Sequence, residues 1–463
     1  MKSDNGVYSP PALKVHVVEQ RTDVRSHWTP CRIGHNVEFS TEKLESYCIA
    51  TWEPVIYDAL LVAAAVEFAD RTQKRHALSW QREFHVVIPV HEPARWKEKA
   101  VADGLHDVLD FLTGDRWRIE FSDRTVPLTE PKQQHFNLPS GVSAVIPYSD
   151  GMDSRCVAGL LDRTIGDKLI RVRLGSRIRD AKVLPQQRQP FTSVPYRVQA
   201  GRHAFVESTA RSRGFKFALI SGLAAYLMKA GRVIVPESGQ GALGPALITV
   251  GQGYADYRSH PLFTDRMGTF LEALLQHKVS FDFTQLWQTK AETLRQFASS
   301  CKSGDLWSST WSCWQQTRQV SVDGRKRQCG VCAACMLRRM SVHAAGLEEA
   351  KESYVWENLA ASSFPSGAAP SFPKRRITRA LREYAIAGTL HLDHLAQLRH
   401  SSANAAMIDL FSFQLCGSLG IEYKEIRSRL NRLLTQHETE WKDFMDSLGR
   451  NSFLRNWAAG AQK

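Results

Sequence analysis

The stretch Ser149–Ser154 reads SDGMDS and brings two hydroxyls, two carboxylates and a glycine between two apolar segments. Residues 142–148 before it are apolar and partly β-branched, which predicts a buried strand, and residues 157–161 after it predict a helix. A turn between a strand and a helix points backbone N–H groups at one spot near the positive end of the helix dipole, where a phosphate can bind. Gly151 suits close approach of the backbone to such a ligand. An ordinary helix start, capped by a side chain of the turn, is the alternative, and both interpretations stay open.

Four cysteines have the spacing of a metal site, and they are Cys313, Cys329, Cys332 and Cys335. Each CxxC turn brings two sulfurs into one coordination sphere, and four thiolates are a ligand set of tetrahedral structural Zn2+. Because four sulfurs leave no open position for substrate, the expected role is to stabilise the fold between residues 311 and 340. Free or redox-active cysteines are the alternative, which is disfavoured because a redox pair needs two sulfurs and not four.

The elements that must position the turn follow from hydrophobic periodicity within residues 140–350. The pattern predicts strand, loop and helix, and then strands at 168–174 and 232–236 with a helix at 210–230 between them. Strands separated by helices predict a parallel sheet with helices on both faces, so the fold class is α/β.

Three segments flank this central region. Residues 1–139 predict a small α+β domain, with helices at 51–70 and 96–113 and strands at 84–90 and 117–121. Residues 351–373 contain the run ASSFPSGAAPSFP, in which no periodic pattern survives, so a linker is expected. Residues 374–463 predict a helical domain that opens with the basic run KRRITRALR. This run suits RNA or an acidic protein surface, and equally a solvated helix end.

Composition limits the class of protein. The 463 residues, 43% of them hydrophobic, suffice for two or three domains. No apolar run approaches the roughly 18 residues of a membrane span, and no signal peptide is recognised, so a cytoplasmic protein is expected. The net charge of +13 favours an anionic partner, which is a nucleotide, a nucleic acid or an acidic protein. The remaining cysteines are expected to be buried small residues in a reducing compartment, and they are Cys31, Cys48, Cys156, Cys301 and Cys416.

The turn resembles the SGGxDS signature of the PP-loop ATP pyrophosphatases, which hold the pyrophosphate of ATP while AMP is passed to a substrate. Further along stand TKAE at residues 289–292 and then WSC followed by CGVCAACMLRR. In this order they resemble the 7-cyano-7-deazaguanine synthases, the QueC family, whose motifs are SGGxDS, TKxE and SCY followed by CGxCxxCxLR. The segments SRGFKFALISGLAAYLMKAGRVIVPESGQG and YADYRSHPLF are similar to that family's arginine-bearing helix and substrate-side segment.

The chain departs from the family pattern at three places. Asp150 replaces the second glycine of the signature and brings a negative charge towards a polyphosphate, which Mg2+ or a nearby cation would offset. Arg213 is followed by a glycine where the family has asparagine. Asp256 and Arg258 flank a tyrosine where the family has cysteine.

The resemblance implies a PP-loop (HUP-like, adenine nucleotide α hydrolase) domain with ATP, Mg2+ and structural Zn2+. It implies that the carboxylate of 7-carboxy-7-deazaguanine is adenylated and then attacked by an amine. The implied catalytic residues are Asp153, Ser154, Lys290 and Arg213. The implied cofactor-binding residues are Ser149, Asp150, Gly151, Met152, Asp153, Ser154, Val172, Arg173 and Leu174. The implied substrate-binding residues are Glu237, Asp256 and Arg258, although a turn cap near Gly239 and a surface cation serve equally well for Glu237 and Arg258.

The whole chain looks most like the QatC family, long QueC-like proteins of the bacterial Qat antiphage systems. That resemblance implies a protein partner from the same operon, QatB-like, whose amine could receive the deazaguanine. One alternative is a tRNA-modifying PP-loop enzyme, which needs a catalytic cysteine, and only Cys156 lies beside the turn; nucleic acid is therefore not the favoured partner. The other is a catalytically inactive PP-loop scaffold of a defence complex, which Asp150 favours and the retention of Asp153 and Lys290 opposes.

Overall fold

The computed structural model describes residues 11–20, 24–41, 53–76, 79–126, 141–174, 192–201, 204–250, 253–300, 307–315 and 320–460. The chain forms two compact units, and each unit combines three separate stretches of sequence. Unit 1 comprises residues 1–148, 165–235 and 256–282, and unit 2 comprises 149–164, 236–255 and 283–463. These units group the chain differently from the predicted domains, which follow the order of the sequence and stay a prediction.

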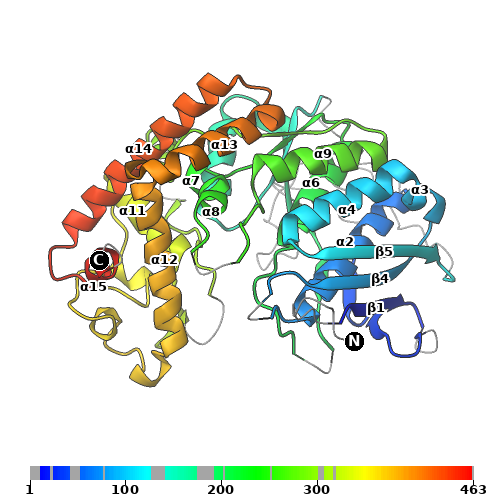
Figure 1. The fold of residues 1–463 in the computed structure, drawn as a ribbon, viewed down its shortest axis with the longest axis horizontal. Coiled ribbons are helices and arrows are strands. Elements are labelled where there is room, and N and C mark those ends of the chain that lie inside the picture. The colour runs from blue at the N-terminus through cyan, green and yellow to red at the C-terminus, as the bar shows by residue number, and fades with distance from the viewer. Residues whose placement is uncertain are drawn as a thin grey trace, which may run out of the picture. The chain divides into compact units, whose positions relative to one another are not determined.

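Unit 1 contains a first sheet of four strands, β1 (Leu13–Val18), β2 (Thr29–Arg32), β4 (Glu83–Val90) and β5 (Arg116–Asp123). The strand order is β2-β1-β4-β5, and every neighbouring pair is parallel (Figure 1). The helices α2 (Pro54–Thr72), α3 (Pro93–Lys97) and α4 (Lys99–Thr113) lie in the connections between these strands. Parallel neighbours need such crossovers, so this segment has an α/β pattern in place of the predicted α+β arrangement.

A second sheet in unit 1 has five parallel strands in the order β11-β10-β6-β7-β8. Its strands are β6 (Ala144–Pro147), β7 (Leu169–Leu174), β8 (Thr192–Val194), β10 (Arg232–Ile234) and β11 (Ser280–Asp282). The predicted parallel sheet is thus confirmed. Counted from β6 the order is 3-2-1-4-5, so the direction of winding reverses between β6 and β10. Ligands of doubly wound sheets bind beyond the carboxyl ends of the two strands at such a reversal.

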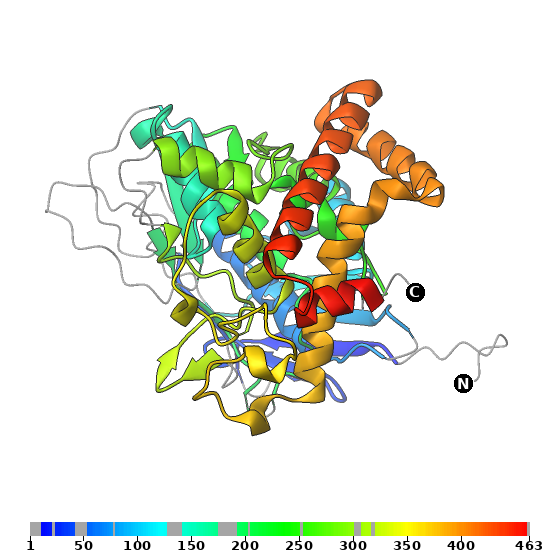
Figure 2. The ribbon, with the colours of Figure 1, turned by 90° about the vertical axis from the view of Figure 1, so that its left-hand side faces the viewer.

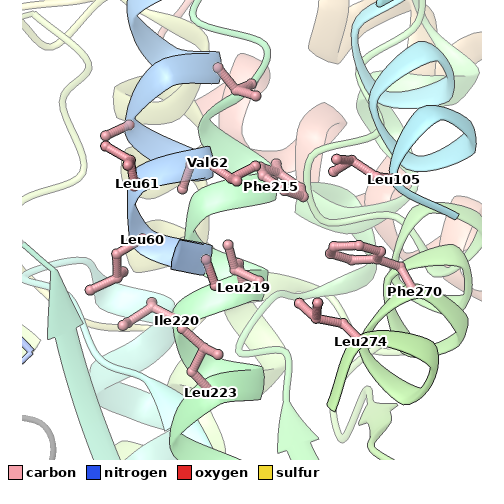
Figure 3. Close-up of a cluster of buried hydrophobic side chains, with 14 of the residues drawn as sticks. Leu60, Leu61, Val62, Leu105, Phe215, Leu219, Ile220, Leu223, Phe270 and Leu274 are labelled. Atoms are coloured by element: carbon pink, nitrogen blue, oxygen red, sulfur yellow. The ribbon is translucent and has the colours of Figure 1, made fainter. Parts of the chain in front are cut away.

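The core of unit 1 lies between helices that cover the two sheets. On the second sheet pack α6 (Arg213–Leu227) and α9 (Pro261–Leu275), and α2 contacts α6 while α4 contacts α9. Leu60 of α2, Leu219 of α6 and Phe270 of α9 meet in this cluster (Figure 3). A Cβ on Gly222 would lie 2.4 Å from Leu271 Cδ1, so glycine permits the close contact of α6 with α9. Unit 1 also holds the antiparallel pair β3 (Val37–Phe39) and β9 (Tyr196–Val198).

Unit 2 is mainly helical among its described residues. Its helices are α5 (Met152–Asp162), α7 (Gly239–Ala242), α8 (Gly244–Leu247), α10 (Lys290–Ser300), α11 (Ala333–Ala344), α12 (Arg379–Gln397), α13 (Ser402–Leu419), α14 (Tyr423–Ser447) and α15 (Phe453–Gly460), with a hairpin of β12 (Ser321–Val322) and β13 (Arg325–Lys326). The predicted helical C-terminal region is confirmed, and α14 runs beside both α12 and α13 (Figure 2). In the part of the chain that is described, no helix has the length and apolar character needed to cross a membrane.

Residues 351–373, predicted as a linker, pack instead into the core of unit 2. Trp356 is fully buried and stacks on Phe364 with ring centroids 4.6 Å apart, while Phe372 lies 5.5 Å from it. The Trp356 indole donates to the Phe364 carbonyl over 2.8 Å, and its backbone N–H donates to the Cys329 carbonyl over 3.1 Å. The aromatic rings explain why this segment packs into the core, because each ring buries far more apolar area than the intervening small residues.

Candidate functional site

The turn Ser149–Ser154, which follows β6, is closed by its two serines. Ser154 Oγ donates to the Ser149 carbonyl over 3.0 Å and accepts the Ser149 N–H over 3.1 Å. Helix α5 begins at Met152 with Gly151 as its N-cap, and no described side chain caps it. The N-cap is therefore not one of the polar side chains of the turn, whereas an ordinary helix start without a ligand stays open. Backbone N–H groups at the first turn of a helix are groups that can bind an anion.

Asp150 and Gly151 shape the backbone of this turn. Asp150 is not among the described residues with a positive φ, so an L-residue fits where the family signature has glycine. A Cβ on Gly151 would lie only 3.0 Å from Ser149 Oγ, whose hydroxyl accepts the Gly151 N–H over 3.1 Å. Glycine at this position therefore preserves the internal hydrogen bond that closes the turn.

Lys290 reaches the turn from the first residue of α10. Its ammonium group forms an ion pair with the carboxylate of Asp153 in the first turn of α5. The Lys290 side chain is 9% exposed and that of Asp153 is 17% exposed, so the pair is largely removed from water. Two residues that the resemblance assigned to catalysis, 137 positions apart, thus meet at the N-terminus of α5. The pair as a whole has no net charge, so Lys290 brings a compact positive charge to the turn together with the compensating carboxylate of Asp153.

The segment Thr289–Glu292 forms a capping box that fixes Lys290. The Thr289 N–H donates to the Glu292 carboxylate over 2.8 Å, and the Glu292 N–H donates to Thr289 Oγ1 over 3.2 Å. Arg432 of α14 donates to the same carboxylate over 2.8 Å. Thr289 and Glu292 of the TKAE motif therefore define the start of α10. The side chain of Lys290 between them extends to the turn.

A buried chain of hydrogen bonds connects Lys290 to the C-terminal helices. The Lys290 N–H donates to Gln240 Oε1 over 2.8 Å, and Gln240 Nε2 lies 2.8 Å from His437 Nδ1. Because Gln240 Oε1 is the acceptor, its amide nitrogen must donate, so His437 Nδ1 accepts. His437 Nε2 then donates to the Leu392 carbonyl over 2.9 Å. Burial lowers the pKa of His437 to about 4, in agreement with this neutral ring.

The four predicted metal ligands come together in unit 2. Their sulfur atoms lie within 4.8 Å of one another, and all four residues are buried. The N–H of Cys329 donates to Cys313 Sγ over 3.2 Å, and the N–H of Cys332 donates to Cys329 Sγ over 3.3 Å. Hydrogen bonds from the three other thiols hold the pKa of Cys313 well below its usual range. The cluster is a candidate metal site whose sulfur ligands are consistent with structural Zn2+, and Cys335 completes the set.

One loop joins the cysteine cluster to the turn. The Trp311 N–H donates to the Asp150 carbonyl over 2.7 Å, and the Trp311 indole donates to the Cys313 carbonyl over 2.9 Å. Arg338 of α11 is fully buried and donates to Thr310 Oγ1 over 2.7 Å in the same loop. A metal ion that holds Cys313 would therefore also fix the backbone on which the turn rests.

Asp256 and Arg258, which were predicted to bind substrate, lie in unit 1 and bind each other. Arg258 Nε lies 2.9 Å from Asp256 Oδ2, and Arg211 Nη1 lies 3.1 Å from Asp256 Oδ1. Burial opposes the charge of Asp256, but the two guanidinium groups outweigh it and lower its pKa to about 2. Arg258 would have to exchange this carboxylate for that of a substrate. The contact of Arg211 with Asp256 was not predicted, because no sequence motif includes Arg211.

Arg213 is the first residue of α6, and it is exposed. No hydrogen bond or ion pair joins it to another residue that the structure describes, and its guanidinium lies 5.3 Å above the Phe217 ring. A Cβ on the following Gly214 would lie 2.9 Å from the Arg258 carbonyl oxygen and 3.0 Å from its Cα. Close packing on the Arg258 backbone therefore explains the glycine at position 214, because the asparagine of the family pattern would clash with that backbone.

The residues predicted to contact adenine lie in β7, between β6 and β8. Val172 and Arg173 are buried there, and Leu174 is half-buried. The Val172 carbonyl accepts the Tyr148 N–H over 2.8 Å, so it already has a partner within unit 1. A role in adenine binding stays a prediction for these residues.

Glu237 is half-buried at the start of α7 in unit 2. A Cβ on Gly241 would lie 2.4 Å from Glu237 Oε2, so the carboxylate lies across the first turn of this helix. The neighbouring Gly239 is equally constrained, because a Cβ there would lie 2.2 Å from the Leu286 carbonyl oxygen. Recognition of a guanine-like edge and a local turn contact both stay open for Glu237.

Met152 and Cys156 of α5 belong to an apolar cluster with Leu294 and Phe297. The Met152 side chain is therefore part of the core, and its predicted role in cofactor binding would rest on its backbone alone. Cys156 is 1% exposed, which does not suit a sulfur nucleophile. Of the other predicted small buried cysteines, Cys31 is buried and Cys416 is half-buried, whereas Cys48 and Cys301 lie outside the described residues.

Comparisons of the chain with protein-family models and with curated proteins find no match. What the site can do chemically therefore depends on its own contacts. Those contacts are a lysine paired with an aspartate, an uncapped helix N-terminus with two serine hydroxyls, and a cysteine cluster connected to the same turn.

Proposed function

We propose that the protein is an ATP-dependent ligase of PP-loop type, which adenylates a carboxylate and passes it to an amine. One observation carries the proposal, namely the Lys290 ammonium at the turn Ser149–Ser154, paired with Asp153 at the uncapped N-terminus of α5. Backbone N–H groups, hydroxyls and a lysine are the groups that hold a polyphosphate. The strand order supports the assignment, because the turn follows β6 at the reversal of winding.

Each group of the site would have its own role in adenylation. A carboxylate reacts poorly with an amine because oxide is a very poor leaving group, and adenylation replaces oxide with AMP. The turn would bind the pyrophosphate, and Lys290 would stabilise negative charge as the acid attacks the α-phosphorus. Asp150 and Asp153 are carboxylates of the kind that hold Mg2+, which would neutralise phosphate oxygens. The resemblance adds Arg213 as a further cation.

The substrate follows from the resemblance alone. It is 7-carboxy-7-deazaguanine. The amine that accepts it is either ammonia or an amine of a partner protein of the QatB type in an antiphage system. The four cysteines would bind Zn2+ for structure, and the cytoplasm is the compartment. Burial of Cys156 speaks against the tRNA thiolation alternative, which needs an accessible sulfur.

The test is pyrophosphate release from ATP and 7-carboxy-7-deazaguanine with Mg2+, with and without ammonium. Lys290→Met and Asp153→Asn should each lower substrate-dependent release by about a hundredfold or more, while circular dichroism stays unchanged. Lys99→Met is the matched control, because Lys99 is 89% exposed in an ion pair with Asp103 on α4. Full activity of the Lys290 variant would place the chemistry elsewhere.

The same assay separates the remaining candidates. A mass gain on the QatB-like partner would identify protein conjugation, and a nitrile or amide product would identify the small-molecule reaction. An inactive scaffold is the second candidate, and Asp150 in the glycine position favours it. No release from the native chain, together with strong release after Asp150→Gly, would establish that second candidate.

A further inference from the structure

Five exposed cations of unit 2 have no ion-pair partner among the residues that the structure describes. Two of them lie in the hairpin of β12 and β13, and three lie in the basic run KRRITRALR, which leads into α12. They are Arg325, Lys326, Lys374, Arg375 and Arg382, and they are here called the basic surface. A single exposed lysine or arginine is usually just solvated, so what matters is whether these five lie together.

Hydrogen bonds hold the hairpin against the basic run. Arg376 Nη1 donates to the Ser321 carbonyl over 3.1 Å, and Ser371 Oγ donates to Asp323 Oδ2 over 2.8 Å. Lys326 is the partner of Ser321 across the hairpin, at the strand spacing of about 5 Å. The hairpin therefore lies beside the segment that leads into α12 (Figure 2), and its two cations adjoin those of the basic run.

Carboxylates do not neutralise the basic surface. Residues 320–328 and 371–384 contain eight lysines and arginines but only two acidic residues, Asp323 and Glu383. Both carboxylates are engaged within unit 2, because Asp323 accepts the Ser371 hydroxyl and Glu383 pairs with Arg379 over 2.7 Å. The local excess of positive charge therefore favours a partner with several negative charges.

An exposed indole adjoins these cations. Trp314 is 55% exposed, although the preceding Cys313 is buried in the cysteine cluster. The next residue, Gln315, hydrogen-bonds through its side chain with Tyr384 of α12, two positions after Arg382. More than half of a large flat ring is therefore open to solvent beside positive charge. Cations for phosphates and an aromatic ring for stacking are the groups with which proteins bind single-stranded nucleic acid.

We propose that the basic surface and Trp314 together bind single-stranded nucleic acid. An acidic protein would use the charge but would not need the open face of the indole, and a duplex keeps the faces of its bases stacked inside. The combination of charge and ring therefore favours a single strand, whose phosphates would meet the cations while a base stacks on Trp314. This proposal is independent of the proposed function, because none of these side chains contacts the turn Ser149–Ser154 or Lys290 in the part of the chain that is described.

The first test is fluorescence anisotropy of a labelled, unstructured oligonucleotide of about 20 nucleotides, titrated with the full chain between roughly 50 and 200 mM salt. The logarithm of the binding constant should fall against the logarithm of salt with a slope of about −3 to −4, as five cations predict. Arg325→Gln combined with Lys326→Gln should weaken binding and make the slope shallower by about 1 to 1.5. Lys97→Gln combined with Lys278→Gln is the matched control, because both are exposed lysines of unit 1 without an ion-pair partner among the described residues. No binding at the lowest salt, or equal effects of the two double variants, would overturn the proposal.

The second test separates a single strand from other polyanions. Trp314→Ala should weaken binding of the oligonucleotide about 5- to 100-fold without a change in the salt slope, and Trp314→Phe should restore most of the affinity because it keeps an aromatic face. Phe413→Ala is the matched control, because Phe413 is 68% exposed on α13, a helix without lysine or arginine, and it should bind as the native chain. Equal binding of poly-glutamate or of a duplex of the same length, or native affinity of Trp314→Ala, would contradict the assignment to single strands.

Discussion

His437 should make the folded protein sensitive to mild acid. The ring is fully buried, accepts a hydrogen bond from Gln240 and donates one to the Leu392 carbonyl, so no position remains for a second proton. Its pKa is lowered from 6.5 to about 4 by burial. Because the folded pKa lies below the unfolded one, protons bind the unfolded chain more strongly, and acid favours unfolding. The contribution of His437 is complete above pH 6.5 and is lost as the pH falls through 4.

The expected magnitude follows from the two pKa values. Between pH 7 and pH 5 the linkage relation gives a loss of about 2 kcal/mol from His437 alone. His437→Gln should remove this dependence, because the amide can keep one acceptor and one donor but does not titrate in this range. Glu440, whose pKa is raised by burial, titrates in both proteins and cancels in the comparison.

The assay is urea denaturation followed by tryptophan fluorescence at pH 7 and pH 5 for the native chain and for His437→Gln. The native chain should lose about 2 kcal/mol more than the variant between the two pH values. His27→Gln serves as the control, because His27 is an exposed residue of unit 1, and it should behave as the native chain. Equal losses in the native chain and His437→Gln would refute the assigned tautomer and the buried chain that depends on it.

Three further changes test other parts of the structure. Metal analysis should find about one Zn2+ per chain, and Cys332→Ser should release it and lower the melting temperature, whereas Cys416→Ser should do neither; a stable, metal-free native chain would contradict the zinc assignment. Gly214→Ala should destabilise the protein by about 1–3 kcal/mol in urea denaturation, because its Cβ strikes the Arg258 backbone, and an unchanged midpoint would contradict that contact. Trp356→Ala should cost about 3–5 kcal/mol by the same measurement, whereas a change within about 0.5 kcal/mol would mean that this segment does behave as a linker.

Local features of the fold could be predicted because they depend on residues that are close in sequence. The predicted strand at 84–90 and helix at 96–113 match β4 and the pair α3 and α4. Cysteine spacing likewise predicted the cluster, since CxxC turns bring sulfurs together through local geometry. The family resemblance assigned Lys290 and Asp153 to one site, but their ion pair was not predicted, because no spacing rule connects two residues 137 positions apart.

Features that depend on distant partners were missed. The first sheet was not predicted to be parallel, because an apolar run indicates a strand but not the direction of its neighbours. The segment 351–373 was predicted as a linker because small residues and prolines dominate its sequence. Its aromatic rings, however, pack on residues elsewhere in unit 2. Gln240 and His437 are 197 positions apart, and a lone glutamine or histidine has no pattern that would mark such a contact.

The interleaving of the two units has a consequence for synthesis on the ribosome. Residues 149–164 carry the turn and α5, but they belong to unit 2, whose remaining stretches are residues 236–255 and 283–463. Asp153 has no ion-pair partner until Lys290 has been synthesised. The Asp150 carbonyl likewise has no donor until Trp311 has been synthesised. A nascent chain that ends before these residues has the SDGMDS turn without the contacts that shape it. The proposed nucleotide site should therefore be completed late, after most of the polypeptide has emerged, and on this proposal incomplete chains should not bind nucleotide.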